Sequence, residues 1–105
     1  MLATRMFVFL SAFILGTVAV SARAETIQVT ITNLVFSPAK VSGKVGDTIE
    51  WINNDIVAHT ATARSGEWDV LIPSKKTTKQ VLNKAGTYEF YCRFHPNMKG
   101  SLSIQ

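Results

Sequence analysis

From residue 26 onwards, apolar and polar side chains alternate along the chain in short runs. In TIQVTITN, residues 26–33, the apolar residues Ile27, Val29 and Ile31 alternate with threonine and glutamine. A period of two places successive side chains on opposite faces of a β-strand. The same pattern predicts further strands over residues 47–53, 59–63, 77–83, 86–92 and 100–105. No stretch beyond residue 24 keeps an apolar helical period for three turns.

Residues that favour turns separate these runs, for example Gly46-Asp47, Asn53-Asn54-Asp55 and Pro96-Asn97. Seven or eight short strands in so short a chain predict one all-β domain, a Greek-key sandwich or barrel. Residues 69–76, DVLIPSKK, are compatible with either a turn of helix or a crossing between sheets.

The first 24 residues follow a different pattern. Arg5 precedes an apolar run over residues 6–20, and residues 22–24 form an A-x-A cleavage sequence. This order is typical of a secretory signal peptide. The run is shorter than the roughly 20 residues that a spanning helix needs, so we expect cleavage after Ala24 rather than a membrane anchor. A domain of residues 25–105 would then be exported to the periplasm.

The charge of the chain excludes some classes of function. The formal net charge is +4 and falls to +2 without Arg5 and Arg23, and no basic cluster with interleaved aromatic residues suggests a nucleic-acid partner. No pair of carboxylates suggests acid–base catalysis, so we do not expect an enzyme. We interpret the acidic residues as solvated strand and turn positions: Asp47, Glu50, Asp55, Glu67, Asp69 and Glu89.

The stretch YCRFHPNM, residues 91–98, concentrates the soft metal-binding side chains of the chain. Cys92 is the only cysteine, Met98 the only methionine beyond residue 24, and His95 one of two histidines with His59. A single cysteine excludes an intramolecular disulfide. In an oxidising compartment a free thiol is a liability unless a metal or an intermolecular bridge occupies it.

Taken together, the four side chains predict a copper site. Each alone has an ordinary role as core filler or as a hydrogen-bonded interior residue. Jointly, two imidazoles, one thiolate and one weak thioether are the ligand set of a blue-copper centre, with His59, Cys92, His95 and Met98 binding one ion. Zinc, the nearest competitor, rarely takes a thioether. The strand period also turns Cys92 inward, onto the same face as Phe90.

Two segments resemble the cupredoxins, the small blue copper proteins. They are VGDTIEWINND, residues 45–55, leading to His59, and AGTYEFYCRFHPNMKGSLSIQ, residues 85–105. The C-x-x-H-x-x-M spacing is the short ligand loop, similar to that of the amicyanins. The resemblance implies equatorial ligands His59, Cys92 and His95 and the axial ligand Met98. It departs at Thr60, where cupredoxins typically have an asparagine that ties the first histidine strand to the ligand loop.

The resemblance implies a monomeric one-electron carrier that cycles between Cu(I) and Cu(II). Its donor and acceptor would be redox proteins, such as a dehydrogenase and a c-type cytochrome. The edge of His95 would lie at the surface among Phe94, Pro96 and Pro73. Basic residues around it would steer an acidic partner, or are simply solvated: Arg93, Lys99, Lys75 and Lys76. A copper-buffering protein without a redox partner and a metal-free interaction domain are the alternatives.

Overall fold

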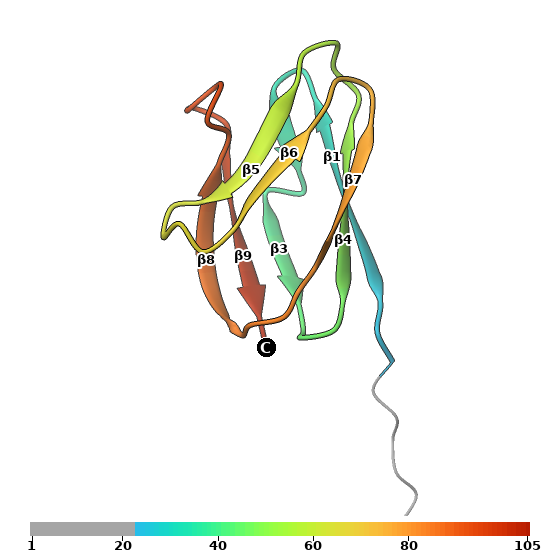
Figure 1. The fold of residues 1–105 in the computed structure, drawn as a ribbon, viewed down its shortest axis with the longest axis vertical. Coiled ribbons are helices and arrows are strands. Elements are labelled where there is room, and N and C mark those ends of the chain that lie inside the picture. Colours follow the sequence, from blue (N-terminus) through green and yellow to red (C-terminus); the bar gives the residue numbers. More distant parts are fainter. Residues whose placement is uncertain (1–22) are drawn as a thin grey trace, which may run out of the picture.

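The computed structural model describes residues 23–105, which form nine strands in two sheets (Figure 1). The expected signal peptide lies outside the described residues except for Arg23 and Ala24. Between residues 23 and 105, no helix is long and apolar enough to cross a membrane. The strands are β1 (Thr26–Thr32), β2 (Val35–Ser37), β3 (Lys40–Gly43), β4 (Thr48–Asn53), β5 (His59–Ala63), β6 (Asp69–Ile72), β7 (Thr77–Val81), β8 (Gly86–Tyr91) and β9 (Lys99–Ile104).

The two sheets pack as a sandwich, which confirms the predicted all-β class. One sheet has the order β2-β1-β4-β7 and the other the order β3-β9-β8-β5-β6. The pairs β1–β4 and β3–β9 are parallel, and the remaining pairs are antiparallel. The strand count exceeds the expected seven or eight because β2 and β3 have only three and four residues, too few to show alternation. The undecided stretch 69–76 begins with strand β6.

The core lies between the sheets and consists of the inward residues of the alternating runs. Ile49 and Trp51 of β4 are fully buried, as are Phe90 of β8 and Leu102 of β9. Phe36, Trp51 and Phe90 form edge-to-face pairs with ring centroids 5.0 to 5.8 Å apart. Such pairs stabilise a core beyond the area that they bury. The predicted inward faces of β1, β4, β8 and β9 are therefore confirmed.

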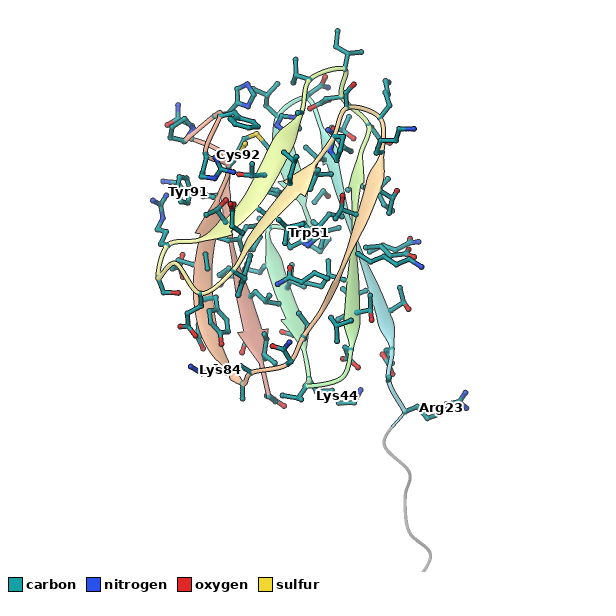
Figure 2. All side chains as sticks on the ribbon, in the orientation of Figure 1. Arg23, Lys44, Trp51, Lys84, Tyr91 and Cys92 are labelled. Atoms are coloured by element: carbon teal, nitrogen blue, oxygen red, sulfur yellow. The ribbon has the colours of Figure 1, made fainter. Side chains whose placement is uncertain are left out.

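The pairing of β5 with β8 brings the segments that carry His59 and Cys92 to one end of the sandwich. The strands are antiparallel, so the beginning of β5 at His59 lies beside the end of β8, just before Cys92. Figure 2 shows Cys92 at this end, Trp51 in the middle and Lys44 and Lys84 at the opposite end. All five residues of β5 are buried, which makes it a rigid support for a site.

Candidate metal centre

Three of the four predicted ligand side chains meet at the end of the sandwich. One potential ligand atom from each of His59, Cys92 and His95 lies within 4.8 Å of the others. The Cys92 Sγ atom is 3.8 Å from His59 Nδ1 and 3.7 Å from His95 Nδ1. His59 and Cys92 are fully buried, whereas His95 is half-buried and reaches the surface.

The separations between these atoms fit ligands that share one metal ion. At bond lengths of about 2.0–2.1 Å to nitrogen and about 2.3 Å to thiolate, as in zinc sites, two ligands lie about 3.5 to 3.8 Å apart for angles of about 110–120°. The observed distances of 3.7 and 3.8 Å fall in this range. The donor atoms are therefore spaced as ligands of one metal ion would be, which the residue types alone could not show.

The loop from Cys92 to Met98 is closed by its own backbone. The amide of His95 donates to the carbonyl of Cys92 at 3.3 Å, and the amide of Met98 donates to the carbonyl of His95 at 2.8 Å. The amide of Cys92 donates in turn to the carbonyl of Met98 at 3.0 Å. Met98 is buried, with 4% of its surface exposed, so all four predicted ligands belong to this end of the fold.

Gly100 lets the chain return from this loop into β9. A Cβ atom at this position would lie 2.5 Å from the carbonyl oxygen of Ala39 and 2.5 Å from the ring of Phe90. Real Cβ atoms essentially never approach other atoms so closely, so a side chain here would push the loop away from the sheet. The glycine is required by close approach of the backbone.

Thr60 makes two contacts with the Cys92 segment although it replaces the asparagine of the cupredoxin pattern. Its backbone amide donates to Cys92 Sγ at 3.4 Å. Its hydroxyl oxygen accepts from the backbone amide of Arg93 at 2.8 Å. Thr60 itself is fully buried, so it fixes the position of the thiol from the side of β5.

Asp55 is a functional candidate that the sequence analysis missed. It was interpreted as a solvated turn residue, but its Oδ2 atom lies 2.8 Å from Nε2 of His59. Its two oxygens also accept from the amides of Asn33 and Leu34 at 2.8 and 3.0 Å. The only available signal was its position four residues before His59, because its other partners come from the distant β1–β2 turn.

These contacts set the protonation of Asp55 and the orientation of the His59 ring. Burial opposes ionisation of Asp55, but the amide of Leu34, together with His59 and Asn33, holds the pKa of this carboxyl below its usual range. An ionised carboxylate accepts the Nε2 proton of His59 and leaves the Nδ1 lone pair directed at the site. Carboxylate partners of this kind fix the tautomer and orientation of metal-binding histidines.

Asp47 and Asp69 also depart from the solvated interpretation. Asp47 is buried, and amide donors at Glu25 and Lys44, together with the Lys44 ammonium, lower its pKa. Asp69 is half exposed but bonded, and the Thr62 hydroxyl and the Arg93 guanidinium lower its pKa. Carboxylates with such partners are bonded to the protein and stabilise the β-sandwich locally, whereas solvated carboxylates would contact only water.

We expect Asp55→Asn to weaken metal binding by about 10- to 100-fold, the usual cost of losing a partner of a metal-binding histidine. The amide cannot act as a full acceptor for His59 and for the two turn amides together. The dissociation constant is measured by competition with a chelator of known affinity, with Glu89→Gln as a carboxylate-to-amide control at an exposed position of β8. Equal affinities of the two variants would show that Asp55 does not orient His59.

Comparison with known proteins places this geometry among copper proteins. Residues 4–104 match the family model described as Cupredoxin-like domain. Amicyanin-alpha of Methylorubrum extorquens is 31% identical over 80% of this chain and 76% of its own length. Plastocyanin of Nostoc punctiforme is 35% identical over 81% and 78%, respectively. The solved structure of a methionine-to-glutamine variant of amicyanin, in the Cu(I) form, matches with a TM-score of 0.67 and 26% identity over 76% of this chain and 82% of that one.

Proposed function

The chain belongs to the cupredoxin-like family, and on this premise we propose that it is an exported one-electron carrier holding one copper ion at His59, Cys92, His95 and Met98. The observation that carries the proposal is the meeting of the His59, Cys92 and His95 donor atoms within 4.8 Å at the end of a rigid sandwich. Bound copper supplies a Cu(I)/Cu(II) couple, which soft sulfur and imidazole ligands accommodate in both states.

The protein holds these side chains in place through contacts that do not involve the metal. Asp55 orients His59, and the amide of Thr60 holds Cys92. The loop that carries His95 and Met98 is closed by three backbone hydrogen bonds. Groups held in this way need little rearrangement when the charge of the site changes, which favours electron transfer over chemistry on a substrate.

We propose that electrons leave through the exposed edge of His95. A shallow pocket of about 340 Å³ lies there and is lined by Leu34, Phe94, His95, Pro96, Asn97 and Met98. Leu34 takes the place that the sequence analysis gave to Pro73, which is not among the lining residues. Phe94 and Leu34 are 49% and 44% exposed, so an apolar docking patch surrounds the histidine. A small patch suits a short-lived complex with a redox protein.

Two of the basic residues that we expected to steer a partner are bonded within the protein instead. The guanidinium of Arg93 pairs with Asp69, and the ammonium of Lys75 donates to the carbonyl of Asn54 at 2.8 Å. We propose that Lys99 and Lys76, together with the small positive net charge, steer an acidic partner. Long-range attraction of this kind falls as salt is added.

We propose that residues 1–24 are a signal peptide and that the domain of residues 25–105 works in the periplasm. The nitrogen of Glu25 lies 2.9 Å from Oδ1 of Asp47. Cleavage after Ala24 would convert this neutral amide into an ammonium group and so strengthen the contact, since charge-assisted hydrogen bonds are the stronger ones. The start of β1 would then be fastened to the turn before β4.

Addition of Cu(II) to the metal-free protein tests the proposal. We expect an intense visible absorption band that disappears with ascorbate, followed by rapid reoxidation when an oxidised c-type cytochrome is added. The reoxidation rate should fall as ionic strength rises. A colourless protein would refute the copper site. A blue protein that exchanges electrons slowly and retains Cu(I) tightly would instead indicate copper buffering.

A further inference from the structure

Two threonines on the outer face of β5 are buried without belonging to the core. The alternation of β5 turns Ala61 and Ala63 inward and Thr60 and Thr62 outward. Thr60 is fully buried, and Thr62 is 8% exposed. Register places Thr62 opposite Asp69 on one neighbouring strand and opposite Tyr91 on the other. The threonines therefore lie between the edge strand β6 and the segment that carries Cys92.

A closed ring of hydrogen bonds joins these strands. The Thr60 and Thr62 hydroxyl oxygens are 2.9 Å apart, and the Thr62 hydroxyl is 2.6 Å from Oδ1 of Asp69. Asp69 accepts two hydrogen bonds of 3.1 Å from the side chain of Arg93. The backbone amide of Arg93 closes the ring at Thr60, with a distance of 2.8 Å.

Proton counting fixes the direction of every bond in this ring. The carboxylate of Asp69 can only accept, so the single hydroxyl proton of Thr62 goes to Asp69. Thr62 must then accept the hydroxyl proton of Thr60. The lone pairs of Thr60 are left to accept from the amide of Arg93. A threonine hydroxyl could otherwise rotate, and here each rotation would leave a buried polar group without a partner.

We propose that this ring, which reaches the surface at Asp69, positions Cys92 from outside the core and so adjusts the redox equilibrium of the site. Arg93 is the next residue after Cys92, and the amide of Thr60 donates to the sulfur. Thr60, Thr62 and Asp69 together connect the β5 strand to the ligand loop, as a single asparagine does in the cupredoxin pattern. Asp69 and Thr62 are positioning residues in this proposal, which rests on the proposed copper site.

The exposed part of the ring, the Asp69–Arg93 ion pair, links the buried site to the solvent-facing surface. The side chains of Asp69 and Arg93 are 50% and 41% exposed, whereas Thr60 is fully buried. Hydrogen bonds in a buried chain polarise one another, so a change at the exposed ion pair reaches the Thr60–Arg93 bond. A hydrogen bond to the thiolate reduces its electron donation and favours Cu(I). Loosening the ring should therefore favour Cu(II).

Thr62→Val tests this proposal because valine has the same shape without the hydroxyl. In the metal-free protein, we expect amide hydrogen exchange at Arg93 to become about tenfold faster, the effect of losing one hydrogen bond. In the copper-loaded protein, we expect the Cu(II)/Cu(I) ratio at a fixed potential to rise about tenfold, which lowers the reduction potential by about 59 mV. Thr62→Ser should restore both values, and Thr30→Val on β1 should change neither.

Unchanged Arg93 exchange and unchanged potential in Thr62→Val would overturn the proposal. If that variant does not fold, Asp69→Asn gives a second test, because the amide nitrogen cannot accept the hydrogen bond that the Arg93 guanidinium donates to Oδ2, and this weakens the ring. Glu89→Gln is its control for the lost charge, and equal values in the two variants would also overturn the proposal. The exchange measurement needs no copper. A protein that fails to bind copper would thus refute the proposed function while the ring itself is still tested.

Discussion

Replacement of Cys92 by serine should abolish the visible absorption band of the copper-loaded protein completely. The band of a blue-copper centre requires the thiolate, and a serine hydroxyl is neither soft nor ionised at neutral pH. Cys92 supplies the only thiol of the chain and lies within reach of both histidines. The two side chains are similar in size, so the fold should persist. Absorption spectra after addition of Cu(II) measure the effect.

The matched control is Ser42→Ala, a change at an exposed serine of β3, far from the loop in sequence. It should leave the spectrum unaltered. Thiol titration gives an independent result: Cys92 is fully buried, so it should react slowly with a thiol reagent in the metal-free protein and more slowly still once copper is bound. A blue colour that survives in the Cys92→Ser protein would contradict the assignment of Cys92 as a ligand.

Replacement of Phe90 by alanine should lower the free energy of unfolding by about 3–5 kcal/mol. The side chain is fully buried, and its ring lies 5.0 Å from that of Phe36 and 5.2 Å from that of Trp51. Its removal leaves a cavity between the sheets that the two rigid neighbours cannot fill. Because domains of this kind are stable by only about 5–15 kcal/mol, the loss is severe. Urea denaturation of the metal-free protein measures it.

Phe94→Ala is the control for this change, since Phe90 and Phe94 lie two residues to either side of Cys92. Phe94 is 49% exposed, so its truncation should alter the free energy of unfolding by about 0.5 kcal/mol or less. It should instead slow electron exchange with a redox partner, because it removes part of the docking patch. Similar losses of stability in the two variants would show that Phe90 does not hold the core together.

Much of the fold could be predicted from alternation because most inward apolar residues of β1, β4, β8 and β9 are buried, with Ile27 at the start of β1 partly buried. Ile49 with Trp51, and Phe90 with Cys92, are pairs of this kind. Strands β2 and β3 could not be predicted in the same way. They are short: β2 pairs with the preceding strand β1 across the turn at residues 33–34, and β3 pairs with the distant strand β9. Neither has enough residues to show a periodic signal of its own.

The ligands of the candidate site could also be predicted from the sequence, whereas the residues that support them could not. Cys92, His95 and Met98 are close in sequence, and the chemistry of their side chains indicates a metal without any knowledge of the fold. The supporting contacts of Asp55, Thr62 and Asp69 depend instead on strand register and on the path of the β1–β2 turn. Aspartate and threonine are also common at solvated positions, so residue type does not distinguish these roles.

The sheet order has a consequence for the rate at which the protein folds. Strands β1 and β4, β3 and β9, and β5 and β8 pair across long stretches of chain, and such distant pairings make folding slow, on the order of milliseconds to seconds. His59 and Cys92 meet only once β5 has paired with β8. A ligand that needs both side chains would therefore bind after the folding barrier has been crossed. Its stabilising effect would be seen in slower unfolding and not in faster folding.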